Sequence, residues 1–225
     1  DKNDPPLIVG PGFRDGEARA ALFDYFWSGK SVLELSHLEA ARCEEIFWFE
    51  QPYSDSPRAA RRENLRPKSA NFKTMAECRR RLLSFAKDQD PAGPFPEKIF
   101  LARESGLSRP YNQSDVEQVA VERGYSIVHL NRLPIARQIS LLANAERIVG
   151  PTGSAFAGTI VAKPGARLLE LATSTKAAKV EDWYSPLASV AGADYWITYG
   201  PFRFDRAAGG VSLDPELLRN RLARF

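Results

Sequence analysis

Short apolar segments alternate with amphipathic segments along the second half of the chain. The apolar segments are rich in Val, Ile, Leu and Phe, which is typical of buried strands, and the segments between them space apolar residues as in amphipathic helices. The expected elements are strand 98–102, helix 112–123, strand 125–130, helix 134–145, strand 147–150, helix 154–163 and strand 167–171. Repeated units of this length predict an α/β fold with a parallel, doubly wound sheet.

The two ends of the chain show the same rhythm less regularly. The elements expected there are strands at 7–9, 31–35, 45–49 and 194–199, and helices from 18 to about 29, from 71 to 87 and after Asp214-Pro215. The proline-rich stretch 90–96 interrupts the pattern, because prolines and glycines break helices and strands. We therefore expect a small N-terminal lobe, residues 1–95, and a C-terminal lobe, residues 96–225.

The composition is that of an ordinary globular protein, with 225 residues, 26% of them charged, and a formal net charge of +3. This charge is too small to predict a nucleic-acid partner. No apolar stretch approaches the roughly 20 residues that cross a bilayer. The two cysteines, Cys43 and Cys78, have no Cys or His at metal-ligand spacing. We expect a soluble protein of the reducing cytoplasm.

The best candidate for a ligand site is the segment Gly150-Pro151-Thr152-Gly153-Ser154-Ala155. A strand is expected to run directly into this turn of small residues and then into a helix. Such a turn leaves backbone N–H groups and the positive end of a helix dipole available to a phosphate, and Thr152 and Ser154 add hydroxyl groups. The alternative is that Ser154 only caps the helix and the glycines only form the turn.

Other polar residues follow strands at the same edge of the predicted sheet, where ligands bind in open α/β folds. Arg103, Arg109 and Asn112 follow the first strand of the alternation, and guanidinium groups suit phosphate recognition. Glu170 stands at the end of the last strand, where a carboxylate can bind ribose hydroxyls. Simpler interpretations are a solvated or ion-paired surface and, for Asn112, a helix N-cap. Gln138, on an apolar helix, contacts either a ligand or neighbouring backbone.

The first half of the chain carries three weaker signals. The turn Gly10–Gly16, followed by Glu34, is one residue longer than the glycine fingerprint of dinucleotide-binding folds, and its simpler interpretation is a chain reversal. His37 follows a strand candidate and is either a general base or a structural residue. The basic stretch from Arg58 to Lys68 is either a solvated face or a contact for an anionic glycan or an acidic membrane surface.

The order of residues from Lys98 to Glu170 resembles glycosyltransferase family 61, which contains capsular-polysaccharide and xylosyltransferase-type enzymes. The positions that carry the resemblance are Lys98-Ile99-Phe100-Leu101-Ala102-Arg103, Arg109, Asn112, Gly124-Tyr125, Gln138, Ala145, Gly150, Gly153, Pro164-Gly165 and Glu170. It covers residues 97–172 well and the rest loosely. The family usually has a His where this chain has Thr152, so either the donor chemistry is retuned or the activity is reduced.

The resemblance implies a GT-B-like pair of Rossmann-type lobes and an inverting transfer of a sugar from a nucleotide-sugar donor to a glycan hydroxyl, in surface or capsular polysaccharide synthesis. On this basis the diphosphate would contact Arg103, Arg109, Thr152, Gly153 and Ser154, and the ribose would contact Glu170, with Gln138 and Asn112 in support. The N-terminal lobe would carry the acceptor and the base, for which Asp15 and His37 are the candidates.

Arginines and a helix dipole can stabilise a departing diphosphate by fixed electrostatics, so we expect neither a metal ion nor a bound cofactor. The expected partners are a nucleotide sugar and a glycan or polysaccharide acceptor, in the cytoplasm or at the inner face of the membrane. Two alternatives come from other classes. One is an NAD(P)-binding oxidoreductase that uses Gly10–Gly16 and Glu34. The other is a non-catalytic glycan-binding or assembly subunit that has lost chemistry at Thr152.

Overall fold

The computed structural model describes residues 7–9, 16–34, 72–90, 93–103, 111–171, 184–198, 202–205 and 210–225. The chain folds as two compact units, residues 1–51 and 52–225. No helix in these described stretches has the length and apolar composition needed to span a membrane.

The first unit contains a strand–helix–strand motif. Strands β1 (Leu7–Val9) and β2 (Val32–Glu34) pair in parallel, and helix α1 (Glu17–Phe26) connects them. Gly16 precedes the helix with a φ of 90°, a conformation that glycine adopts without steric cost. The strands and the helix expected in this region are confirmed, whereas the strand expected at 45–49 lies outside the described residues.

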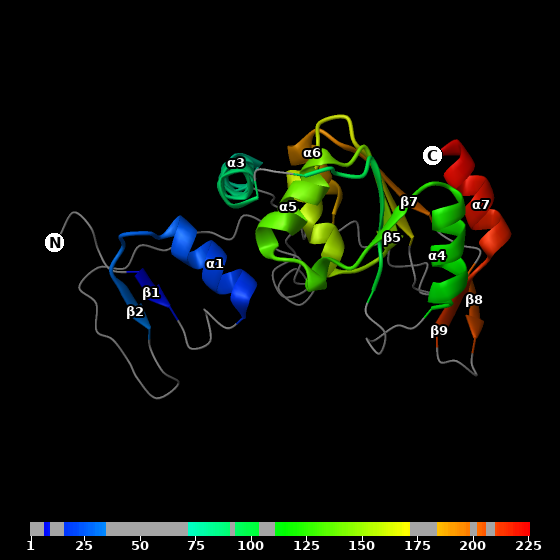
Figure 1. Cartoon of the computed structure of the whole chain (residues 1–225), viewed down its shortest axis with the longest axis horizontal. Coiled ribbons are helices and arrows are strands. Elements are labelled where there is room, and N and C mark those ends of the chain that lie inside the picture. Colours follow the sequence, from blue (N-terminus) through cyan, green and yellow to red (C-terminus); the bar gives the residue numbers. More distant parts are fainter. Residues whose placement is uncertain are drawn as a thin grey trace, which may run out of the picture. The chain divides into compact units, whose positions relative to one another are not determined.

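A five-stranded parallel sheet forms the centre of the second unit (Figure 1). Its strands are β3 (Lys98–Leu101), β4 (Ser126–Val128), β5 (Arg147–Pro151), β6 (Arg167–Leu171) and β7 (Asp194–Thr198). The order across the sheet is β4-β3-β5-β6-β7, and every neighbouring pair is parallel. β3, β5 and β6 are buried after their first residue, which explains their continuous apolar runs. The predicted α/β fold with a parallel sheet is confirmed.

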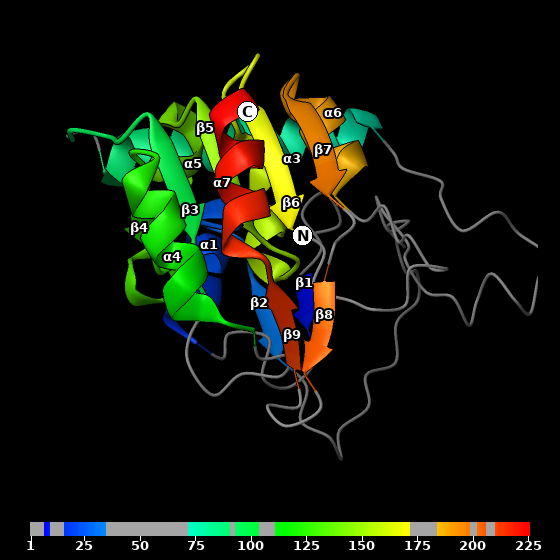
Figure 2. The ribbon, with the colours of Figure 1, turned by 90° about the vertical axis from the view of Figure 1, so that its right-hand side faces the viewer.

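Helices cover both faces of this sheet (Figure 2). On one face, α4 (Gln113–Glu122) packs against α7 (Pro215–Arg224). On the other face, the 3₁₀ helix η2 (Ser154–Val161) contacts both α5 (Ile135–Asn144) and α6 (Ser185–Ala191), and α3 (Phe72–Gln89) packs on all three. This distribution follows from right-handed crossovers, because the chain moves one way from β3 to β4 and the other way from β4 to β7.

Residues 154–163 were expected to form a helix, and the structure has the 3₁₀ helix η2 there. Phe156, Thr159 and Ala162 are fully buried at three-residue spacing, which is the period of a 3₁₀ helix. The Thr159 hydroxyl donates to the Phe156 carbonyl at 2.7 Å. The three-residue spacing therefore places all three side chains in the core.

Helix α3 belongs to the second unit, whereas the prolines suggested a boundary after it. Met75, Phe85 and Ala86 are its buried residues, and they explain why it stays with α5, η2 and α6. Two further elements were not expected from the sequence. They are α6 and the antiparallel hairpin of β8 (Phe202–Asp205) and β9 (Gly210–Leu213), which leads into α7 (Figure 1).

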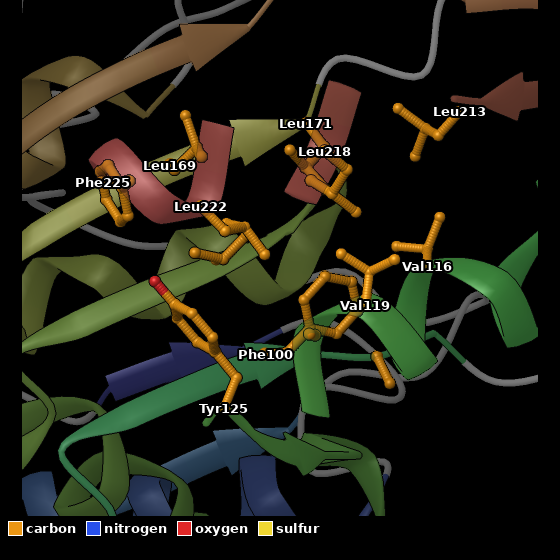
Figure 3. Packing of buried hydrophobic residues seen from close by; sticks show 13 residues of the cluster. Phe100, Val116, Val119, Tyr125, Leu169, Leu171, Leu213, Leu218, Leu222 and Phe225 are labelled. Atoms are coloured by element: carbon orange, nitrogen blue, oxygen red, sulfur yellow. The ribbon is translucent and has the colours of Figure 1, made fainter. Parts of the chain in front are cut away.

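The core between the sheet and the pair α4 and α7 joins residues that are far apart in the sequence (Figure 3). Its members include Phe100, Val116, Val119, Tyr125, Leu169, Leu218, Leu222 and Phe225. The Asp214 side chain accepts hydrogen bonds from the N–H groups of Glu216 and Leu217, at 2.9 and 3.2 Å. It therefore caps α7 at the predicted start.

Candidate functional site

The strand order creates a switch point between β3 and β5. The chain leaves β3 for α4 on one face of the sheet and leaves β5 for η2 on the other. At such a point a crevice opens outside the carboxyl ends of the two strands, and ligands bind there in open α/β sheets. The residues that follow the two strands are Arg103 and the turn Thr152-Gly153-Ser154. The structure thus brings together two features that the sequence placed 49 residues apart (152 − 103).

The guanidinium group of Arg103 lies against Gly153. A Cβ atom added to Gly153 would lie 3.5 Å from Nε and 3.6 Å from Nη2 of Arg103. The φ of Gly153 is 176°, which is extended backbone that any residue can adopt. The glycine therefore serves to leave space beside the guanidinium group rather than to relieve backbone strain.

The turn also presents backbone donors. The Thr152 N–H continues the ladder to β6 by donating to the Leu171 carbonyl at 2.9 Å, and the Phe156 N–H donates to the Gly153 carbonyl at 3.0 Å. Between them, the N–H groups of residues 153–155 donate to no acceptor in the described stretches. The first N–H groups of a helix lack intrahelical partners and attract anions. Together with Arg103 they form a site suited to a phosphate group.

A buried carboxylate lies behind this turn. Glu170 on β6 is 3% exposed; its Oε1 accepts a hydrogen bond from the Thr152 hydroxyl at 2.5 Å, and its Oε2 accepts one from the Tyr195 hydroxyl. A hydroxyl can donate one hydrogen bond, and Thr152 donates its hydrogen bond to Glu170. Thr152 can therefore only accept a hydrogen bond from a ligand. Glu170 is therefore placed to orient Thr152, and its expected contact with ribose stays a prediction.

Asn112 and Gln138 use their side-chain amides within the protein. The Nδ2 of Asn112 donates to the Leu213 carbonyl at 2.9 Å, and its Oδ1 accepts from the Leu213 N–H at 2.8 Å. Asn112 precedes α4 as the expected N-cap residue, but its side chain ties the helix start to β9 instead of capping it. The Nε2 of Gln138 donates to the Leu133 carbonyl at 2.9 Å, which is the backbone contact that the sequence left as an alternative.

Tyr111 is a residue near the site that the sequence analysis did not consider. Burial, followed by the negative charge of Glu117, raises the pKa of the Tyr111 phenol to about 12, and the Arg103 charge opposes this shift. The phenol is therefore a neutral group beside Arg103 across the physiological range. The Arg103 carbonyl accepts a hydrogen bond from Gln113 Nε2 at 2.9 Å.

Tyr195 was also missed, although its strand was expected. Leu168 pairs with Tyr195 across β6 and β7, so Tyr195 shares the face of the sheet on which Leu168 and Glu170 lie. Finding it from sequence would have required the register of the two strands. The alternation within β7 alone does not supply that register.

Two carboxylates with D-x-D spacing, Asp88 and Asp90, stand at the end of α3. Asp90 forms an ion pair with Arg137, at 3.4 Å. Within the described ranges, no three His, Cys, Asp or Glu side chains are grouped as a metal site.

The remaining candidates fall outside the described residues. They are Asp15, His37, Arg109, the basic stretch from Arg58 to Lys68 and most of the Gly10–Gly16 turn. Their assignments as base, phosphate ligand, surface contact and dinucleotide turn stay predictions.

A protein-family model described as Glycosyltransferase 61 matches residues 20–169. The matched stretch includes Arg103 and the turn at 152–154, and it ends one residue before Glu170. It also reaches well into the N-terminal half, beyond the region where the sequence resemblance was close. No curated protein matches the chain.

Proposed function

The chain belongs to glycosyltransferase family 61, whose model matches residues 20–169, and we propose that it transfers a sugar from a nucleotide-sugar donor to a hydroxyl group of a glycan. The observation that carries the proposal is the convergence of Arg103 with the N–H groups of residues 153–155 at the β3/β5 switch point. A diphosphate is the part of such a donor that needs several hydrogen-bond donors and positive charge in one place.

The proposed step is a single displacement. The acceptor hydroxyl attacks the anomeric carbon of the donor sugar, a base takes the hydroxyl proton, and the bond from that carbon to the diphosphate oxygen breaks with its electron pair on the diphosphate. Arg103 and the N–H groups of the turn stabilise the growing negative charge, because they are already oriented before the reaction. Asp15 and His37 remain the proposed bases.

Thr152 changes the electrostatics of this site compared with the family's usual His. A threonine cannot carry a positive charge, and the hydroxyl group of this threonine donates its hydrogen bond to Glu170. Stabilisation of the leaving group would therefore come from Arg103 and the backbone, both of which keep their charge distribution across the physiological pH range. We propose that metal ions are not required, so activity should survive chelation by EDTA.

The finer features of the assignment are also proposals. They are a GT-B-like arrangement with the acceptor on the first unit, a role in surface or capsular polysaccharide synthesis, and a cytoplasmic location with contact to the inner membrane face through the basic stretch from Arg58 to Lys68. The parallel β1–α1–β2 motif of the first unit is compatible with a Rossmann-type lobe.

The test is a thermal-shift panel of UDP, GDP, CMP, their sugars and NADPH on the wild type, Arg103→Ala and Arg81→Ala. A ligand at about 100 times its Kd stabilises a protein by roughly 2.7 kcal/mol. We expect one nucleotide class to raise the Tm of the wild type and of Arg81→Ala but not of Arg103→Ala. Arg81 is a matched control because it is an exposed arginine on α3 whose ion pair, among the described residues, is with Glu77 on its own helix.

Release of the nucleotide from the matching nucleotide sugar then measures turnover. A Tm response to NADPH alone would contradict the proposal and favour the oxidoreductase. Binding without turnover in the presence of acceptor would favour the non-catalytic glycan-binding subunit, the alternative connected with Thr152.

A further inference from the structure

The opposite edge of the sheet, where the strands begin, carries a row of cations. Lys98, Arg147 and Arg167 are the first residues of β3, β5 and β6, and they are paired in register across the three strands. Side chains in register on neighbouring parallel strands point to the same face, and the strands are about 4.8 Å apart. Three positive charges therefore lie side by side, an arrangement that is unfavourable unless something neutralises it.

Within the described part of the chain, no carboxylate forms an ion pair with a member of this row. Lys98 reaches the end of α4, where its Nζ lies 3.5 Å from the Arg123 carbonyl. Among the described residues, Arg147 interacts with the Tyr125 hydroxyl, and neither Arg147 nor Arg167 forms an ion pair with a carboxylate. Asp194 continues the row next to Arg167 but does not pair with it. Two partly buried guanidinium groups are thus left without a carboxylate partner.

Arg167 is held in a fixed orientation by aromatic rings. Its guanidinium carbon lies 5.3 Å from the ring centroid of Trp196 and 4.7 Å from that of Phe225, and the two rings meet edge to face. A guanidinium group stacked on a ring keeps the N–H donors at its rim free for a planar or tetrahedral oxyanion. Trp196 is 42% exposed, so an apolar ring surface lies directly beside these donors.

The Tyr125 hydroxyl is a further donor that lacks an acceptor. Tyr125 is 3% exposed, and no described residue accepts a hydrogen bond from its buried hydroxyl. Figure 3 shows the ring directed toward the end of α7, near Leu222 and Phe225. Burial raises the pKa of this phenol, while the charge of Arg147, its hydrogen bond to the phenol and the charge of Arg167 act in the opposite direction. Cations offer no acceptor for a phenolic proton, whereas an oxyanion held by the two arginines would.

We propose that this edge binds an oxyanion-bearing sugar of the acceptor glycan, with its carboxylate or phosphate on Arg147 and Arg167 and its ring against Trp196. The inference rests on the proposed function, because that function supplies a glycan as substrate. The two ends of β5 are roughly 15 Å apart, at about 3.3 Å per residue. A polymer can therefore occupy this site while its end is at the reaction site.

The arrangement favours a glycan over a membrane surface. The arginines are packed against rings or partly buried, and Trp196 lies on a strand rather than on a protruding loop. Membrane contacts rely instead on clusters of solvated lysines and arginines with apolar side chains that insert. Sugar rings bind to flat aromatic surfaces flanked by polar groups, which is the pattern here.

The test is a titration of the full chain with a glucuronic-acid oligosaccharide, in which binding is measured by tryptophan fluorescence. It compares the wild type with Trp196→Phe, Arg147→Gln, Arg167→Lys and Arg81→Gln. Inorganic phosphate, a neutral glucose oligosaccharide and phosphatidylserine vesicles are the comparison probes. We expect the acidic oligosaccharide to change the fluorescence of the wild type and of Arg81→Gln, and the change to vanish in Trp196→Phe. Affinity should fall at least about tenfold in Arg147→Gln, because the variant loses a charge-assisted hydrogen bond to the oxyanion.

Arg167→Lys keeps the positive charge but loses the planar guanidinium group. A severalfold loss of affinity for the acidic oligosaccharide with an unchanged Tm would show that Arg167 acts in recognition rather than in folding. The inference is overturned if the neutral oligosaccharide binds equally well, if phosphate alone binds as tightly as the acidic oligosaccharide, or if only the vesicles bind. Arg103→Ala should bind the acidic oligosaccharide normally. A protein that binds this probe but no nucleotide would refute the proposed function and leave this site in place.

Discussion

The two edges of the parallel sheet both display arginines, yet their surroundings differ. At the carboxyl edge, Arg103 lies beside a glycine turn with open N–H groups, and a carboxylate is buried behind that turn. At the amino edge, Lys98, Arg147 and Arg167 form a row, and α4 and α7 end there. The carboxyl ends of helices carry partial negative charge, so cations have a structural reason to gather at that edge.

The difference shows how strand direction selects the kind of donor available for binding. Helix starts, with their N–H groups, occur where strands end, so the carboxyl edge combines backbone and side-chain donors. The amino edge has side-chain donors alone. Among the described residues, two of its arginines lack a carboxylate partner and one phenol lacks an acceptor. Accordingly, we assign the diphosphate to the carboxyl edge and an anionic sugar to the other.

The largest effect on nucleotide binding is expected when an arginine of the carboxyl edge, rather than one of the amino edge, is replaced by alanine. Arg103→Ala should weaken nucleotide binding by about 100-fold, because each charge-assisted contact to phosphate contributes about 1.5–3 kcal/mol. Arg147→Ala should change nucleotide affinity by less than about twofold. Calorimetric titration of both variants checks this, and equal losses would erase the distinction between the edges.

Two glycines of the carboxyl edge should respond differently to alanine. A Cβ at Gly150 would lie 2.8 Å from the Leu101 carbonyl oxygen and 2.9 Å from the Leu101 Cβ, so Gly150→Ala must spread β3 from β5. We expect the free energy of unfolding to fall by about 1–3 kcal/mol, measured by urea denaturation.

Gly153→Ala should fold normally, because its backbone is extended and the nearest side-chain atom is 3.5 Å from the added carbon. Its methyl group enters the space beside Arg103, so nucleotide affinity should drop by about tenfold, or 1.4 kcal/mol. Unchanged affinity would show that the phosphate does not occupy this space.

Thr152→Val tests whether the buried carboxylate supports the turn. It removes the donor to Glu170 Oε1 and should lower the free energy of unfolding by about 1–2 kcal/mol, because the buried carboxylate loses a hydrogen bond. Thr152→Ser should restore both stability and nucleotide affinity. If Val and Ser behave alike in chemical denaturation, the hydrogen bond does not hold the turn.

The smallest effect at neutral pH is expected from Tyr111→Phe. The pKa of Tyr111 is raised from 10.0 to about 12 in the folded chain, mainly by burial, so the folded state holds its proton more tightly than the unfolded state. Stability from this group is complete below pH 10 and is lost as the pH rises from 10 through 12. Urea denaturation across this range should show a shallower alkaline decline for Tyr111→Phe than for the wild type.

The sequence predicted those parts of the molecule that local patterns determine. Apolar runs such as Ile99 to Leu101 predicted buried strands, and the small residues between Gly150 and Ala155 predicted a strand, a turn and a helix start in the right order. Because parallel strands end at one edge, the same reasoning placed Arg103 near that turn.

Long-range pairings could not be predicted from the sequence. Asn112 satisfies both of its amide groups on Leu213, 101 residues away, and Tyr195 reaches Glu170 only through the register of β6 and β7. Local periodicity carries no information on which distant peptide completes a side chain's hydrogen bonds. For this reason Asn112 was expected to support the donor site or to cap a helix, and Tyr195 was overlooked.

The central claim is that the turn after β5 binds the donor's diphosphate, and backbone amide NMR tests it most directly. Titration with the nucleoside diphosphate found in the thermal-shift panel should shift the amide signals of Gly153, Ser154 and Ala155 first and most. The amides of Lys98, Arg147 and Arg167 should stay in place. Shifts confined to the amino edge, or to the Gly10–Gly16 turn of the first unit, would contradict the account.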